Sequence, residues 1–263
     1  MTESVSARTV LLTCDFEAAY TKHVGFEGYR THSAPAMARI LTERGLPMSW
    51  LIQLEREDLY LNVDYFHDRI APLLRWEDGH TVELHVHFNF GPNEDDTVRE
   101  NRLRLLDRGI AMLERHGYKA QALRPGPTGL YVEDLGEIAD RGIEVLACSH
   151  RSVHELTSPA APPYSPDYVA EGPGDVRLLM IPTSRVEGGH AYFDGGYEAV
   201  RAVVASVPRG VPLCLGCHDY ADVASTMERI VDDLLGDGAR FVNIRQLADE
   251  VRAGDYASEA APS

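Results

Sequence analysis

The sequence predicts an α/β fold and, within that class, a (β/α) barrel of seven or eight strands. Short runs of β-forming residues alternate with helical patterns along almost the whole chain of 263 residues, as expected of parallel strands joined by helices. Barrels of this kind commonly reach such a length as one domain. A doubly wound open sheet is the alternative, but no glycine-rich dinucleotide-binding loop follows the first strand. We therefore expect a single domain over residues 1–255 and a disordered tail over residues 256–263.

The predicted strands are short runs rich in apolar and β-branched residues, which is typical of strands buried in a parallel sheet. The first of them, residues 9–13, reads Thr-Val-Leu-Leu-Thr and leads toward two acidic residues. The complete set is residues 9–13, 48–52, 81–88, 121–123, 144–148, 176–181, 212–216 and 240–244.

The predicted helices carry apolar residues at helical spacing and tend to end at glycine. Residues 34–44 show this pattern, and Gly45 follows them. A long helix is expected up to His116, with Asp95 or Asp96 as its N-cap. The remaining helical patterns cover residues 58–75, 131–140, 197–207, 223–235 and 245–251.

Residues 151–174 are rich in proline, serine and glycine and predict a long irregular loop. The alternation of strands and helices resumes after it, so the segment is an insertion in the barrel and not a domain linker. A loop of this length in a compact domain is commonly a lid or a binding loop. We therefore expect His150, directly before it, to contact a substrate.

The charge of the chain excludes two classes of partner. The formal net charge is −16, with 41 acidic and 25 basic residues. Nucleic acids and anionic membrane surfaces both require basic patches, so neither is expected to bind. The acidic surface is compatible with a homo-oligomer formed through an apolar helix face.

The N-terminal sequence and the cysteines indicate a cytoplasmic protein. The chain begins without the basic and apolar segments of a signal peptide, and no apolar run reaches the roughly 18 residues of a membrane span. The four cysteines are therefore expected to be reduced thiols. Cys214 and Cys217 partly match a metal or redox pair, but we interpret them as small hydrophobic residues of a buried strand.

The most informative stretch is residues 79–90, Gly-His-Thr-Val-Glu-Leu-His-Val-His-Phe-Asn-Phe. His85, His87 and Asn89 alternate with apolar residues, and a period of two places these three polar side chains on one face of a strand. They could line a metal or substrate site. Two ordinary surface histidines on a half-exposed strand are the alternative, and these residues alone leave both open.

Acidic, imidazole and guanidinium side chains gather where the predicted strands end. In a parallel barrel the C-terminal ends of the strands meet at one rim, which carries the chemistry of such barrels. The residues expected at this rim are Asp15, Glu17, His85, His87, Asn89, Arg124, Ser149, His150, His218 and Asp219. Scattered surface charge would not concentrate there, so the pattern favours a functional site.

The order and content of these blocks resemble the polysaccharide deacetylase family of carbohydrate esterases, the metal-dependent N-deacetylases of chitin, peptidoglycan and related amino sugars. The likeness extends over residues 9–220, and it implies the distorted TIM-type barrel of that family. The matching segments are Thr13-Cys-Asp-Phe-Glu-Ala18, Leu46-Pro-Met-Ser-Trp-Leu51, Gly79-His-Thr-Val-Glu-Leu-His85, Arg124-Pro-Gly126 and Cys217-His-Asp-Tyr220.

The resemblance implies a role for each matching residue. Asp15 would be the general base that activates the attacking water, and Arg124 would keep it ionised and oriented. His218 would be the general acid that protonates the departing amine. Glu17 and His85 would bind a divalent metal ion, with zinc expected first and cobalt, nickel or manganese as alternatives.

One position departs from the family pattern. The second metal-binding histidine of the family follows the first by four residues, and Asn89 stands there. An amide oxygen is a weaker ligand than imidazole, particularly for zinc. His87 lies on the same predicted face and can replace it. Three outcomes stay open: a site made of Glu17, His85 and either His87 or Asn89, a weakly held harder cation, or a barrel without metal.

We therefore expect a metal-dependent hydrolase that removes an N-acyl group, acetyl first among them, from a small amino sugar or related metabolite. His150 and Asp219 are the expected substrate contacts. Two alternatives stay open. The barrel could instead run acid–base chemistry, as an isomerase, lyase or cyclase with little or no metal, or it could be a binding protein that keeps only the pocket.

Overall fold

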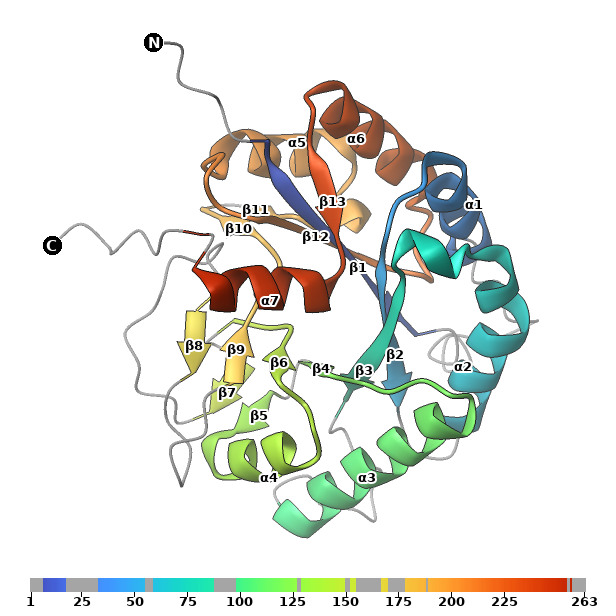
Figure 1. Ribbon diagram of the computed structural model, residues 1–263, viewed down its shortest axis with the longest axis vertical. Helices are drawn as coiled ribbons and strands as arrows, with labels where there is room; N and C mark the ends of the chain where they lie inside the picture. The colour runs from blue at the N-terminus through green and yellow to red at the C-terminus, as the bar shows by residue number, and fades with distance from the viewer. Residues whose placement is uncertain are drawn as a thin grey trace, which may run out of the picture.

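The computed structural model of the protein describes residues 7–17, 33–54, 59–87, 98–126, 129–149, 152–154, 167–169, 178–187, 189–254 and 256. Their main sheet is parallel and curled, and helices surround it, as Figure 1 shows. Its strands are β1 (Thr9–Phe16), β2 (Ser49–Leu54), β3 (Thr81–Val86), β4 (Ala122–Pro125), β6 (Val145–Leu146), β9 (Leu178–Met180) and β12 (Leu213–His218). They pair in the order β12-β1-β2-β3-β4-β6-β9. The predicted (β/α) barrel is confirmed.

Further backbone contacts complete the sheet. Strand β13 (Arg240–Val242) pairs in parallel with the start of β1, and β8 (Asp167–Val169) pairs antiparallel with β9. The segment after β9 lies against β12, because the amide of Ser184 donates to the carbonyl of Cys214 and the amide of Gly216 donates to Ala191, both at 2.8 Å. The two ends of the parallel path are thereby brought together, and the sheet curls into a distorted barrel.

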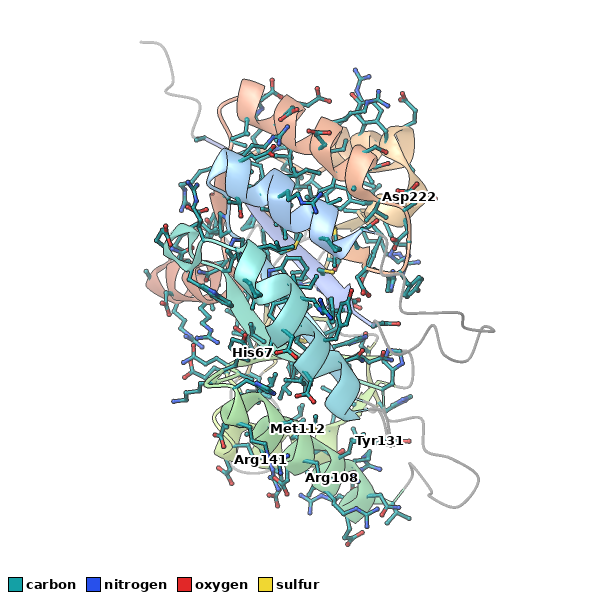
Figure 2. The ribbon with its side chains drawn as sticks, turned by 90° about the vertical axis from the view of Figure 1, so that its right-hand side faces the viewer. His67, Arg108, Met112, Tyr131, Arg141 and Asp222 are labelled. Atoms are coloured by element: carbon teal, nitrogen blue, oxygen red, sulfur yellow. The ribbon has the colours of Figure 1, made fainter. Side chains whose placement is uncertain are left out.

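Helices cover the outside of the barrel. They are α1 (Ala34–Arg44), α2 (Leu59–Tyr65), α3 (Arg99–Arg115), α4 (Leu135–Asp140), α5 (Tyr197–Ser206), α6 (Ala224–Gly236) and α7 (Ile244–Ala253). Helix α1 ends as predicted at Gly45, whose φ of 63° is the left-handed conformation that glycine adopts readily. In the side view of Figure 2, α1, α2 and α3 follow one another along the sheet. None of the helices that the structure describes is long and apolar enough to cross a membrane.

Two helical predictions need correction. Helix α3 begins at Arg99 with Val98 as its N-cap, so neither Asp95 nor Asp96 caps it. The predicted helical stretch 58–75 is α2 followed by a π-helical and a 3₁₀ turn. Aspartate is a frequent N-cap, but packing against the sheet decides which turn of a polar segment becomes the first helical turn.

The prediction also missed several very short strands. In the predicted helix 131–140 only Tyr131 belongs to a strand, and Val132–Asp134 form a 3₁₀ turn that runs into α4. Of the predicted loop 151–174 the structure describes residues 152–154 and 167–169, which contain two short strands, and the rest of the segment lies outside the described residues. Strands of two or three residues carry no readable periodicity, since only their partner strand defines them. The short strands outside the main sheet are β5 (Leu130–Tyr131), β7 (Val153–His154), β10 (Arg185–Val186) and β11 (Gly189–His190).

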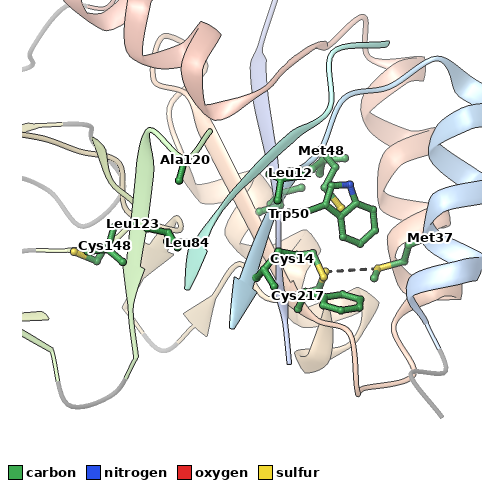
Figure 3. Packing of buried hydrophobic residues seen from close by; sticks show 14 of the residues in the cluster. Leu12, Cys14, Met37, Met48, Trp50, Leu84, Ala120, Leu123, Cys148 and Cys217 are labelled. Carbon is green, nitrogen blue, oxygen red and sulfur yellow. Dashed lines mark hydrogen bonds between the residues drawn. The ribbon is translucent and has the colours of Figure 1, made fainter. Parts of the chain in front are cut away.

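The outer face of the sheet packs against the helices, and Figure 3 shows part of this core. Cys14 of β1 is paired with Cys217 of β12, and both lie fully buried near Trp50 and Met37. All four cysteines are buried free thiols. The interpretation of Cys214 and Cys217 as small hydrophobic residues is therefore confirmed.

Helix α7 closes the N-terminal end of the barrel and crosses the front of Figure 1. Its buried Ile244, Leu247 and Ala248 pack against apolar side chains of the strands that point into the barrel. The fully buried Glu83 of β3 accepts hydrogen bonds from Arg245 of this helix, at 2.7 Å, and from two backbone amides at the start of β4. Apolar packing and one ion pair thus seal this end, and the opposite rim is left for chemistry.

Asn243 joins α7 to the barrel. Its side-chain oxygen accepts the amide of Gln246 at 2.8 Å, and its amide group donates to the carbonyl of Gly79 at 2.7 Å. We expect Asn243→Ala to lower the free energy of unfolding in urea by about 1–2 kcal/mol, because both bonds are lost. Asp249→Ala, on the exposed face of the same helix, should change it by less than about 0.5 kcal/mol. Equal losses in the two variants would contradict the capping role.

Candidate active site

The strand register brings the predicted rim residues to one level of the barrel. Asp15 of β1 is paired with His218 of β12, and His85 of β3 is paired with Arg124 of β4. Directly paired residues of neighbouring strands point to the same face of the sheet. The carboxylate, the imidazoles and the guanidinium therefore meet at the C-terminal end of the barrel, where barrel enzymes carry their chemistry.

Glu17, His85 and His87 form a compact buried cluster. Nε2 of His85 lies 2.9 Å from Oε1 of Glu17 and 2.9 Å from Nε2 of His87. Nε2 of His87 lies 3.4 Å from the same carboxylate oxygen. The three possible ligand atoms lie within 4.8 Å of one another, and none of the side chains belongs to an exposed residue. Asn89, the alternative ligand, lies outside the described residues.

The hydrogen bond of His85 on its other nitrogen tests whether this cluster fits a metal ion. Nδ1 of His85 lies 3.1 Å from the carbonyl oxygen of Arg124, and a carbonyl only accepts, so Nδ1 carries the proton. In the neutral ring Nε2 then has a lone pair, and this lone pair faces the Glu17 carboxylate. Two acceptors at 2.9 Å repel unless a cation or a further proton lies near both. A backbone carbonyl orienting Nδ1–H is also typical of metal-bound histidine, so the cluster fits a divalent cation.

The charge state and position of Glu17 suit the same role. Burial raises the pKa of Glu17, but when His85 and His87 carry a proton on Nε2 their hydrogen bonds to the carboxylate outweigh burial and hold the pKa well below its ordinary value. A cation in the cluster would favour the ionised carboxylate in the same way. The backbone amide of Glu17 donates to Oδ1 of Asp219 at 2.6 Å. Asp219 was predicted to contact the substrate. Its side chain has no exposed surface, so we correct this prediction and assign Asp219 to the support of the Glu17 backbone.

The His87 ring is held by two neighbours. Nε2 of Gln53 lies 3.2 Å from Nδ1 of His87, on the side away from Glu17. On the other side Gly126 leaves space for the ring, because a Cβ atom there would lie 2.2 Å from Cδ2 of His87. Such a distance is a severe clash, so the absence of a side chain at position 126 permits this orientation of His87.

Asp15 and Arg124 form a buried ion pair beside the cluster. Nη1 of Arg124 donates to Oδ1 of Asp15 at 2.5 Å. The same guanidinium also donates to the hydroxyls of Thr13 and Thr183, at 3.1 and 3.2 Å, and through Nε to the carbonyl of Ala147 at 2.9 Å. The guanidinium is thereby fixed at several points, and it holds Asp15 in one orientation with its charge balanced.

His218 lies on the opposite side of Asp15 and has its own carboxylate partner. Nδ1 of His218 lies 2.6 Å from Oδ2 of Asp194, and its Nε2 lies 3.8 Å from Oδ2 of Asp15. Burial lowers the pKa of His218, but the hydrogen bond to Asp194 and the charges of Asp15 and Asp194 raise it to a net value above the ordinary one. A histidine of raised pKa whose Nε2 edge faces the site suits proton donation near neutral pH.

Most predicted site residues meet in one place, with three exceptions. Asp15, Arg124 and His218 converge with the cluster of Glu17, His85 and His87. His150 and Asn89 lie outside the described residues, and Asp219 supports the site from behind. The sequence analysis missed Asp194, which belongs to none of the matching segments. A histidine that acts as a general acid needs a carboxylate partner, but the spacing of residues in the sequence does not identify that partner.

Comparisons with known proteins support the fold. No family model and no curated protein matches the sequence. Among solved structures, the peptidoglycan deacetylase PdaC from Bacillus subtilis is 12% identical, with a TM-score of 0.57, over 96% of this chain and 95% of that one. A mutant of BA3943, a CE4 family pseudoenzyme with restored enzymatic activity, is 15% identical, with a TM-score of 0.58, over 93% of this chain and 69% of that one.

The chain therefore has the fold of the CE4 carbohydrate esterases, and the resemblance drawn from its motifs is confirmed in the fold. The same fold also hosts other chemistry. The 4-alpha-glucanotransferase from Thermococcus litoralis is 12% identical, with a TM-score of 0.62, over 92% of this chain and 38% of that one. Since pseudoenzymes and a transferase share the fold, activity has to be argued from the site.

The space that Gly126 leaves for His87 is testable. We expect Gly126→Ala to displace the His87 ring and to weaken zinc binding at least about tenfold in a competitive chelator titration, because one of three ligands moves. The far-ultraviolet circular dichroism should stay unchanged. Gly236→Ala is the matched control, since a Cβ there meets nothing within 4 Å. Unchanged zinc affinity in Gly126→Ala would show that His87 is not a ligand.

Proposed function

We propose that the protein is a metal-dependent hydrolase that removes an N-acyl group, most simply acetyl, from a small amino sugar or a related metabolite. The observation that carries the proposal is that Glu17, His85 and His87 form one cluster that could hold a metal ion. Beside this cluster lie Asp15, which is bonded to Arg124, and His218, which is bonded to Asp194. The likeness of the fold to a peptidoglycan deacetylase supports an amino-sugar substrate.

Glu17, His85 and His87 would hold the metal ion. One carboxylate and two imidazoles are a ligand set of catalytic zinc sites, and zinc is therefore the first expectation, ahead of cobalt, nickel or manganese. When bound, a divalent cation supplies Lewis-acid chemistry, since it polarises an acyl oxygen and makes water more acidic.

Asp15 and His218 would carry out the proton transfers. Asp15, held in place by Arg124, would accept a proton from the attacking water. His218 would donate the proton on Nε2 to the amide nitrogen, so that the C–N bond breaks to give a carboxylic acid and an amine. Its other nitrogen stays bonded to Asp194, which fixes the ring and the proton that it donates.

The net charge of −16 favours a neutral substrate over a strongly anionic polymer, because the summed field of the chain repels anions. This supports an uncharged N-acetyl amino sugar over a phosphorylated or acidic glycan.

Metal content and acetate release test the proposal together. We expect about one equivalent of zinc by mass spectrometry in protein purified without chelators, and acetate release from N-acetylglucosamine or its β-1,4-linked dimer. Asp15→Asn should retain metal and lose at least about 10²-fold in turnover, the typical share of a general base. Asp249→Asn, on the exposed face of α7, is the matched control.

Two alternatives correspond to other outcomes of this experiment. Ligand binding without turnover, unchanged by Asp15→Asn, would indicate a binding protein that keeps only the pocket. Turnover of another kind that needs Asp15 and His218 but no metal would indicate a repurposed acid–base enzyme. A pseudoenzyme is among the similar structures, and this supports the alternative of a binding protein.

The pairing of His218 with Asp194 predicts a pH effect. A general acid acts only when protonated, so activity should fall as the pH rises through the His218 pKa, which lies above its ordinary value of 6.5. Asp194→Asn removes the negative partner and lowers this pKa, so the falling limb of the kcat/KM profile should move to lower pH. Asp233→Asn, at the outer helix α6, should leave the limb in place. If the falling limb of the kcat/KM profile stays at the same pH in Asp194→Asn, His218 is not the general acid.

A further inference from the structure

Two tyrosine rings stack against the His218 ring. The ring centroid of Tyr192 lies 5.2 Å from that of His218, with an angle of 21° between the planes. The Tyr220 centroid lies 5.0 Å away, with an angle of 28°. Both pairs are stacked, so aromatic contacts restrain the imidazole.

The stacked rings and a hydrogen bond together fix the orientation of the histidine. Its Nδ1 edge is bonded to Asp194. Its Nε2 edge faces the site, 3.8 Å from Oδ2 of Asp15. Rotation of the ring about its side-chain bonds would have to displace at least one tyrosine.

Tyr192 also contacts the other half of the site. Its hydroxyl donates to Oδ2 of Asp15 and accepts from Nη1 of Arg124, each at 3.4 Å. Burial keeps the pKa of this hydroxyl far above its ordinary value, so it remains a hydrogen-bond donor. One side chain thus contacts both the residue that would accept a proton and, through its ring, the residue that would give one.

The backbone holds Tyr192 in this place. Tyr192 forms a parallel bridge with Gly216 of β12, two residues before His218. A Cβ atom at Gly216 would lie 3.1 Å from the tyrosine ring, closer than ordinary van der Waals contact. The missing side chain at position 216 therefore lets the Tyr192 ring lie directly on the strand that carries His218.

We propose that Tyr192 is a positioning residue that sets the separation of Asp15 and His218, with Tyr220 as a second ring stacked against His218. The inference rests on the proposed function and deepens it, because the arrangement matters most for substrates whose leaving group must be protonated. An amide nitrogen leaves only with a proton from the general acid. A nitrophenolate is stable enough to leave as an anion, so an aryl ester needs the general base but not the acid.

The test compares two substitutions on two substrates. Tyr192→Leu removes the Tyr192 ring from His218, whereas Tyr192→Phe keeps the ring and loses only the hydrogen bonds of the hydroxyl. We expect Tyr192→Leu to lower kcat for release of acetate from the N-acetylglucosamine dimer by about 10²-fold, with KM changed little, since general-acid catalysis is impaired. Hydrolysis of 4-nitrophenyl acetate should change less than about threefold, and Tyr192→Phe should restore most of the amide activity.

A matched control and a structural readout make the result decisive. Tyr197→Leu removes a partly buried tyrosine of the next segment, whose hydroxyl bonds Asp233 away from the site, and it should spare both activities. A crystal structure of Tyr192→Leu should show the His218 ring turned from its 3.8 Å approach to Asp15. Equal losses on amide and ester, or an unmoved His218 ring, would overturn the inference. If the wild type releases no acetate from amides, the proposed function fails, and the ring position still decides whether Tyr192 positions His218.

Discussion

The buried ion pair between Arg124 and Asp15 is the constraint on which the site depends. Both residues lie inside the barrel with at most 5% of their surface exposed. A buried charge left without its partner costs several kcal/mol, so the two groups must be placed together and bonded on their remaining sides. The hydroxyls of Thr13 and Thr183 and the carbonyl of Ala147 meet that need for the guanidinium.

The same short segment also orients the cluster of Glu17, His85 and His87. The carbonyl of Arg124 determines which nitrogen of His85 is protonated, and Gly126 leaves the space that the His87 ring occupies. The side chain of Arg124 thus holds Asp15, the proposed base, and its backbone carbonyl orients His85. A single turn after β4 therefore organises the base and two of the three proposed metal ligands.

Much of the fold followed from the sequence, because it depends on local patterns. Alternating strands and helices predicted the barrel, and Gly45 marked the end of α1. Strand ends located Asp15, His85, Arg124 and His218 at one rim. The predictions that failed concern features that depend on contacts between distant segments. The strands of two or three residues exist only through their partners, and the buried position of Asp219 follows from the backbone of Glu17. Asp194 shows no motif of its own and is recognised only beside His218.

In the proposed metal site, histidines two residues apart replace the more widely spaced pair that the resemblance implies. X-ray absorption spectroscopy of the protein loaded with one equivalent of zinc tests this ligand set most directly. We expect two imidazole nitrogens and a carboxylate oxygen at about 2.0–2.2 Å from the zinc, and one imidazole fewer in His87→Ala. A zinc environment that contains a single imidazole in the wild type, or one that His87→Ala leaves unchanged, would contradict this ligand set.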